Sequence, residues 1–189
     1  PTFANSTPVT YVNGWIVIQQ RIDGSQSFNR TWSTYKAGFG TYDANFWLGL
    51  EKIFQLTNSH NYKLRFEVLV IDGSWISDEY ETFKIDSEGS QYALHVSDYS
   101  GDNLDILNQQ IFNGGHCHNG MRFSTYDQNY TPRGTQCPTE FSSGNWFNAN
   151  CYAQNVFGII FDVTVRGYYT AKYQTWTRIK ACRMMIKLY

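Results

Sequence analysis

The sequence has few charged residues and no run of one charge sign. Of its 189 residues, 16% are charged, and 15 basic residues nearly balance 16 acidic ones, for a formal net charge of -1. Nucleic-acid-binding domains usually gather basic residues on one face, and anionic membrane surfaces attract similar clusters. We therefore expect neither nucleic acid nor a charged membrane surface as the partner.

Long apolar runs are absent, and so is cysteine before Cys117. No stretch approaches the roughly 20 apolar residues that a membrane-spanning helix needs, so we expect no membrane insertion. The spacings of Cys117, Cys137, Cys151 and Cys182 fit no zinc-ligand pattern, which favours disulfides. Four cysteines allow three connectivities. We expect Cys137 to pair with Cys151, which leaves Cys117 and Cys182 to each other.

Aromatic residues, by contrast, are abundant at 17%. With so few charges, the surface must depend on Asn, Ser, Thr, Gln and Tyr, a composition more typical of secreted than of cytosolic proteins. Asn-x-Thr sequons begin at Asn5, Asn29 and Asn129, and each is a candidate glycosylation site. Together with disulfides, they predict a secreted, extracellular glycoprotein.

The first part of the sequence alternates between strand and helix patterns. Residues 14–22, GWIVIQQRI, are rich in β-branched residues and predict a central strand. Residues 29–40 and 45–58 carry apolar side chains at helical spacing and predict two short amphipathic helices. Residues 62–71 then alternate apolar and polar side chains, as a half-buried strand does.

Residues 76–85 and 92–101 repeat this alternation, so we expect an antiparallel meander that the two helices cover on one face. Residues 178–189 alternate again and predict a last strand added to the sheet. The fold class is α+β. We expect one domain over residues 1–189, with a sheet subdomain of 11–100 plus 177–189 and a loop-rich ligand and calcium subdomain of 101–176.

The histidines do not predict an enzyme. His116 and His118 flank Cys117, but a Cys-His hydrolase needs an orienting third group, and no such pattern is visible. We interpret them as exposed loop histidines beside a disulfide, and His95 as a residue of the sheet surface. No catalytic residue is predicted.

Several motifs resemble the fibrinogen-related domain, in that family's order. Residues 14–32, GWIVIQQRIDGSQSFNRTW, are similar to its Gly-Gly-Trp-Thr-Val-Ile-Gln-Arg-Arg opening, and residues 38–57 to its Gly-Glu-Phe-Trp-Leu-Gly helix. Residues 118–129, HNGMRFSTYDQN, resemble its Phe-Ser-Thr-x-Asp-x-Asp calcium segment, and residues 182–188 its closing strand. The Cys137 and Cys151 pair resembles the second family disulfide.

This resemblance to the recognition module of fibrinogen chains, ficolins, tachylectins and angiopoietins implies binding and not catalysis. It also implies that the family's N-terminal cysteine-bearing subdomain is missing from this sequence. The first hypothesis is a lectin-like module that binds glycans or acetylated ligands, as on pathogen surfaces in innate immunity. The alternative is a protein-binding module, that is, a receptor ligand or a matrix or adhesion component. Family members gain avidity on an upstream stalk, which implies a homo-oligomer.

The resemblance implies a calcium site in residues 127–133. Asp127 and Asn129 would bind Ca2+ through side chains, and Thr131 and Arg133 through backbone carbonyls. The family has a second Asp where this sequence has Asn129, so one formal charge is lost. The alternative is an Asx-turn in a polar loop without metal.

The resemblance also implies an acetyl pocket at a cis peptide bond between Asn150 and Cys151. The expected ligand-binding residues are Phe147, Asn150, Cys151, Tyr152, Tyr168 and Tyr169. Tyr152 replaces the histidine of acetyl-binding members and Phe147 replaces a tryptophan, and these changes favour the protein-binding alternative. We expect Trp146 and Trp176 to form a satellite core beneath the loops.

Overall fold

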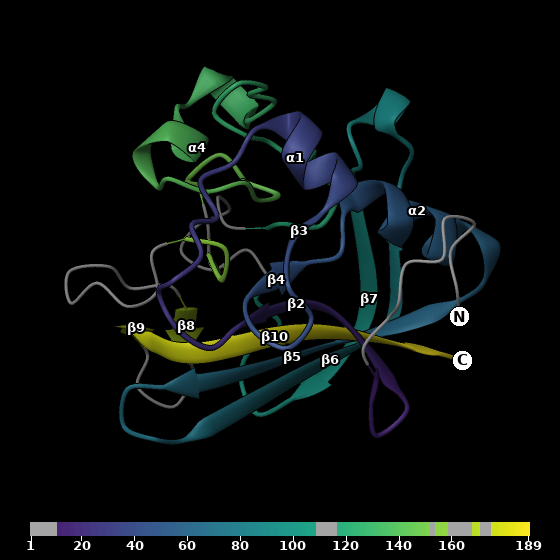
Figure 1. Ribbon diagram of the computed structural model, residues 1–189, viewed down its shortest axis with the longest axis vertical. Helices are drawn as coiled ribbons and strands as arrows, with labels where there is room; N and C mark the ends of the chain where they lie inside the picture. The colour runs from purple at the N-terminus through teal and green to yellow at the C-terminus, as the bar shows by residue number, and fades with distance from the viewer. Residues whose placement is uncertain (1–10, 109–116, 152–153, 159–167, 171–174) are drawn as a thin grey trace.

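The computed structural model describes residues 11–108, 117–151, 154–158, 168–170 and 175–189, with the backbone alone for 168–170 and 175–176. Figure 1 shows a sheet in the lower part of the molecule, with helices α1 and α4 and the green loops of the middle of the sequence above it. Within the described residues, no helix has both the length and the apolar character needed to cross a membrane.

The main sheet has eight strands, and every neighbouring pair in it is antiparallel. Seven strands follow the order β3-β4-β2-β10-β5-β6-β7, and β1 pairs with β2. The strands are β1 Tyr11–Val12, β2 Trp15–Arg21, β3 Phe39–Gly40, β4 Phe46–Trp47, β5 Tyr62–Val70, β6 Trp75–Ile85, β7 Leu94–Gly101 and β10 Ile179–Leu188. The predicted central strand is confirmed, because β2 lies between β4 and β10.

The predicted meander is confirmed in β5, β6 and β7. Along β5 every second residue is buried and the others are partly exposed, so the alternation in the sequence matches the two faces of the strand. On the more exposed face, Arg65 forms ion pairs with Glu67 and Glu79, and Arg183 of β10 also pairs with Glu67. The Arg65–Glu79 and Arg183–Glu67 pairs each join two strands and favour the observed register of β10, β5 and β6.

The closing strand is confirmed, and it lies inside the sheet. β10 pairs with β2 on one side and with β5 on the other. Its residues Met184, Met185 and Ile186 are buried, which places the last strand in the hydrophobic core. The alternating pattern predicted a strand here without predicting its neighbours.

Both predicted helices are present, as α1 Trp32–Ala37 and α2 Leu50–Ser59. The hydroxyl of Thr31 caps α1 by accepting the backbone N–H of Thr34 at 3.3 Å. Gly49, before α2, has a φ of +111°, and a Cβ there would lie 2.8 Å from the carbonyl carbon of Ala37. Only glycine fits this close approach. α2 buries Leu50, Ile53, Leu56 and Thr57.

The described part of residues 101–177 contains little regular structure. It includes the 3-10 helix η2 Pro132–Gly134, the helix α4 Cys137–Glu140, and the strands β8 Tyr168–Thr170 and β9 Thr175–Thr177, which pair with each other. Another 3-10 helix, η1 Glu88–Ser90, precedes β7.

Phe123, Trp146 and Phe157 belong to the same buried cluster as the sheet residues. The prediction of a satellite core is therefore wrong for Trp146, because its ring packs into the main core.

Candidate functional site

Buried hydrogen bonds attach the loop region to α1 and to the turn that precedes β7. The hydroxyl of Tyr35 donates to the carbonyl of Phe28 at 2.6 Å and accepts the N–H of Gly144 at 3.1 Å. The indole N–H of Trp146 donates to the carbonyl of Tyr92 at 2.8 Å. Because these groups are buried, they would be unsatisfied without these bonds, and each bond gives them a hydrogen-bond partner. These bonds therefore fix the position of the backbone at Gly144 and Trp146, where the loops that follow begin.

The predicted disulfide between Cys137 and Cys151 is present, with a Cα–Cα distance of 5.4 Å. It joins the start of α4 to the turn at residues 148–151. Phe147 is fully buried and packs with the two cysteines, with Phe141 beside them. Phe147 was expected to be a wall of an acetyl pocket. Its ring instead fills the space beneath the disulfide, so it presents no surface to a ligand.

The second predicted disulfide is wrong, because Cys117 and Cys182 are both free. Cys182 lies in β10 opposite Arg21 of β2, and its thiol faces the core, 3.7 Å from the carbonyl of Val156. Cys117 is half-buried in a loop, 3.4 Å from the carbonyl of Leu107. Burial raises the pKa of the Cys182 thiol to about 11. Two remaining cysteines in a sequence need not be neighbours in the fold.

The predicted cis bond before Cys151 is also wrong, since none of the described peptide bonds is cis. The backbone reverses through a tight turn in which Asn148 and Cys151 exchange two hydrogen bonds of 3.0 Å. Cys151, the last residue of this turn, has a left-handed φ of +73°. Asn150 is exposed at the tip. Tyr152 lies outside the described residues, and only the backbone of Tyr168 and Tyr169 is described, in β8.

His118 is fully buried, in contrast to the predicted exposed position. Its Nδ1 lies 2.8 Å from the carbonyl of Trp146, and its Nε2 accepts the N–H of Gln154 at 3.3 Å. A neutral ring with its proton on Nδ1 satisfies both bonds. His118 thus has a structural role, and His116 lies outside the described residues. The prediction for His95 is confirmed, because it is exposed on β7 and pairs with Asp86.

Among the residues predicted to bind calcium, Asp127 contacts α1, and Asn129 contacts Thr131. Asp127 Oδ1 accepts the N–H of Trp32, the first residue of α1, at 2.9 Å, and the hydroxyl of Thr125 at 2.7 Å. Asn129 Oδ1 accepts both the N–H and the hydroxyl of Thr131, at 3.0 and 2.7 Å. Arg133 adopts a left-handed φ of +60° within η2.

This donor set does not fit the predicted calcium site. Calcium prefers six to eight hard oxygens, several of them charged. Here one carboxylate is present, and one of its oxygens already accepts two protein donors. In the part of the protein that the structure describes, no cluster of three or more His, Cys, Asp or Glu side chains is placed to hold a metal.

A recess of about 520 Å³ opens beside the loop region and was not predicted. Arg21 lies at its inner end, only 4% exposed, with its guanidinium carbon 4.4 Å from the centre of the Phe28 ring. Its Nη1 donates to the carbonyls of Val156 and Gly158, and its Nε has no hydrogen-bond partner among the described residues. Burial lowers the pKa of Arg21. The recess is lined by Arg21, Gly24, Ser25, Gln26, Ser27, Phe28, Asn29, Ser142, Phe157 and Gly158.

The sequence carried a signal for this buried arginine. Arg21 continues the alternation of Val17 and Gln19, and all three side chains are buried. Gln19 and Arg21 both donate to the carbonyl of Val156, at 3.2 and 3.3 Å. An arginine on the interior side of a predicted central strand indicates a buried cation with carbonyl partners.

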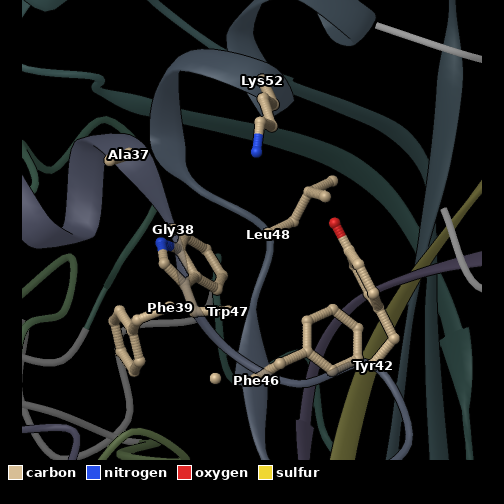
Figure 2. A pocket seen from close by; sticks show the side chains of 9 residues that line it. Ala37, Gly38, Phe39, Tyr42, Phe46, Trp47, Leu48 and Lys52 are labelled. Atoms are coloured by element: carbon tan, nitrogen blue, oxygen red, sulfur yellow. The ribbon is translucent and has the colours of Figure 1, made fainter. Parts of the chain in front are cut away.

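A smaller hollow, of about 160 Å³, lies between the ends of α1 and α2. Figure 2 shows the Lys52 amine, from α2, and the Tyr42 hydroxyl pointing into the space over Leu48, with the rings of Phe46 and Trp47 below. Burial lowers the pKa of Lys52. The hollow is lined by residues 37–40, Tyr42, residues 46–48 and Lys52, away from the disulfide-bonded loops.

Comparisons with known proteins agree with the fold. Residues 8–189 match the family described as "Fibrinogen beta and gamma chains, C-terminal globular domain". Angiopoietin-related protein 2 of Mus musculus is 39% identical over 136 residues, which cover 72% of this protein and 26% of that relative. Ficolin-3 of Homo sapiens is 36% identical over 149 residues, covering 77% of this protein and 46% of that relative. The present sequence therefore spans less than half of either relative.

A solved structure agrees as well. A lamprey fibrin D-dimer, complexed with the peptide ligand Gly-His-Arg-Pro-amide, superposes with a TM-score of 0.84 and 28% identity, over 98% of this protein and 66% of that one. The resemblance seen in the motifs is thus confirmed over nearly the whole sequence. The protein belongs to the family formed by the C-terminal globular domains of fibrinogen beta and gamma chains.

Proposed function

We propose that this domain is an extracellular recognition module that binds a segment of another protein in the recess at Arg21. One observation carries the proposal. The recess is open and borders the loop region, whereas Phe147, the expected wall of an acetyl pocket, is fully buried. An extracellular location is supported by the Cys137–Cys151 disulfide, because disulfides persist in oxidising compartments.

The chemistry of the recess suits a peptide. Its rim carries Ser and Asn side chains that can bond to backbone amides, and Phe28 and Phe157 provide apolar surface. Arg21 supplies positive charge at the inner end, which favours a segment with a carboxylate. The lamprey fibrin structure, which contains a peptide ligand, supports peptide binding as a use of this fold.

The second candidate is recognition of glycans or acetylated ligands. The similarity to human Ficolin-3 favours it, as do exposed Tyr126 and Asn150 in the loop region. Tyrosine rings and amide side chains both suit sugar hydroxyls and acetyl groups. No catalytic activity is proposed for either candidate.

The test is to select peptides from a displayed random library on the purified domain and to measure their affinities for the wild type and two variants. Ser27→Glu adds a longer side chain and a negative charge at an exposed position that lines the recess, and this charge repels a peptide carboxylate. Ser33→Glu makes the same change at an exposed position of α1 outside the recess. We expect Ser27→Glu to weaken binding at least about tenfold, which corresponds to about 1.4 kcal/mol, and Ser33→Glu to leave it unchanged.

A glycan array, probed in parallel with the same three proteins, separates the two candidates. Saturable binding to glycans, with no peptide selected, would support the second candidate and reject the first. Selected peptides whose affinity is equal for the wild type and Ser27→Glu would place peptide binding elsewhere on the domain.

A further inference from the structure

The loop of residues 125–137, called here the Asp127 loop, is closed by side-chain hydrogen bonds. The Nδ2 of Asn129 donates to the carbonyl of Thr135 at 2.7 Å, and the hydroxyl of Thr131 donates to the same carbonyl. The Oδ1 of Asn129 accepts the N–H of Thr131, and it shares the single proton of the Thr131 hydroxyl with the carbonyl of Thr135. Three residues within a seven-residue stretch thus converge on one point.

Backbone groups fix the orientation of the Asn129 amide. The N–H of Thr131 can only donate, so it selects the amide oxygen, and the carbonyl of Thr135 can only accept, so it selects the amide nitrogen. Rotating the amide by half a turn would oppose a donor to a donor and an acceptor to an acceptor. The amide protons therefore point toward the carbonyl that closes the loop.

A cation bound among these groups would meet unfavourable electrostatics. The amide nitrogen carries partial positive charge, and both hydrogen bonds to Asn129 Oδ1 would have to break before that oxygen could bind a metal. Asp127, the remaining carboxylate in the segment, is held by Thr125 and the N-terminus of α1. An aspartate at position 129 would instead leave the Thr135 carbonyl without its amide donor.

We propose that the Asn129 amide takes the place of a cation in the Asp127 loop, so that this domain folds and keeps the loop closed without calcium. The Asn129 amide and the Thr131 hydroxyl bind the Thr135 carbonyl as a metal ion would. Closure of the loop therefore does not require extracellular calcium. Loop closure is measured by unfolding, so the result is independent of which ligand the domain binds.

The test compares thermal unfolding of the wild-type domain in calcium chloride and in excess chelator. We expect the same Tm in both conditions. In chelator, Asn129→Asp is expected to lower the Tm by about 2–4 °C or more, because the amide donor is lost and a negative charge faces a carbonyl. Gln136→Glu is the matched control, since it adds the same charge at an exposed position of the same loop. It is expected to keep the wild-type Tm.

Two results would overturn the proposal. One is a wild-type Tm that falls in chelator and recovers when calcium is returned in excess. The other is an Asn129→Asp variant that melts in chelator at the wild-type temperature, because the amide would then contribute nothing to loop closure.

Discussion

Tyr35 satisfies two buried backbone groups that are far apart in the sequence. Its hydroxyl joins the carbonyl of Phe28 to the N–H of Gly144, and all three groups are buried. Burial raises the pKa of Tyr35 far above its usual value, so the hydroxyl stays protonated and can donate at any physiological pH. The bond to Gly144 is one of the contacts that position the loop region.

We predict that Tyr35→Phe lowers the free energy of unfolding by about 1–3 kcal/mol, because it leaves a buried carbonyl and a buried N–H without partners. Urea denaturation at neutral pH measures the change. The matched control is Tyr126→Phe, which removes a hydroxyl from a ring that is 47% exposed, and it should leave stability unchanged. Equal stability of the two variants would contradict the assigned role of Tyr35.

Cys182 makes the stability sensitive to alkaline pH. Burial raises the pKa of its thiol from 9.0 to about 11 in the folded protein, so folding favours the protonated form. A pKa that is raised on folding contributes stability that is complete below the unfolded value and is lost as the pH rises through the folded value. The relevant window for Cys182 therefore lies between pH 9 and pH 11.

We predict that the wild type loses stability more steeply than Cys182→Ala across this window. Urea unfolding in steps of pH provides the comparison, and tyrosines with raised pKa values contribute equally to both proteins. Below pH 9 the two stability curves should run parallel. Parallel curves above pH 9 as well would show that the thiol does not resist ionisation.

At the scale of elements, the disulfide connects α4 to the turn at residues 148–151, where regular structure is scarce. The two cysteines are separated by 14 residues, and closing a loop of this size restricts the unfolded polypeptide. It also holds Phe147 beneath the turn.

We predict that reducing the disulfide lowers the free energy of unfolding by about 3 kcal/mol, the value that conformational entropy gives for a loop of about 15 residues. Guanidinium unfolding with and without reductant measures this. Because Cys117 and Cys182 are free, reductant should have no effect on a variant with Cys137→Ser and Cys151→Ser. A reductant effect in that variant would mean that another cysteine pair exists.

The elements that the sequence predicted are those whose pattern is local. The alternation over residues 62–71 reports which side of a strand is buried, and β5 follows it residue by residue. The contact between Asp127 and Trp32 could not be read in this way, because 95 residues separate the two positions. The calcium prediction came from a short motif, which does not show that Asp127 also accepts the N–H of the first residue of α1.

The candidate site was less predictable than the fold, for a related reason. Phe147 was expected to line a pocket because of the family resemblance, and His118 was expected to be an exposed loop residue, but both are fully buried in the fold. In a loop region, long-range packing decides exposure, and no periodicity reports it. The recess at Arg21 is formed by Arg21 and residues 24–29 together with Ser142, Phe157 and Gly158, so no single segment contains its signal.

At the scale of the whole molecule, one aromatic cluster joins the sheet to the loop region. The ring of Phe123 lies 5.0 Å from the centres of both Tyr35 and Trp146, with an edge-to-face geometry to Trp146. It also lies 6.4 Å from Trp47 of β4, in a stacked arrangement. The two regions therefore share their core, and we expect them to unfold together.

We predict that Phe123→Ala lowers the free energy of unfolding by about 3–5 kcal/mol and keeps a single transition. Far-UV and near-UV circular dichroism, recorded through one denaturant titration, should give the same midpoint for the variant. Phe54→Ala, at a partly buried position of α2, should cost less. Separate midpoints for the two signals would mean that the loop region unfolds independently of the sheet.

The position of β10 has a consequence for biosynthesis. Among the described strands, β2 and β5 are joined in the sheet only through β10, which is translated after the other strands of that sheet. A nascent polypeptide that has not yet passed Leu188 therefore holds two half-sheets, each with an unpaired edge that can attract other molecules. Folding must wait until translation of this strand is complete, and a premature stop codon before Ile179 would be as damaging as one near the beginning of the domain.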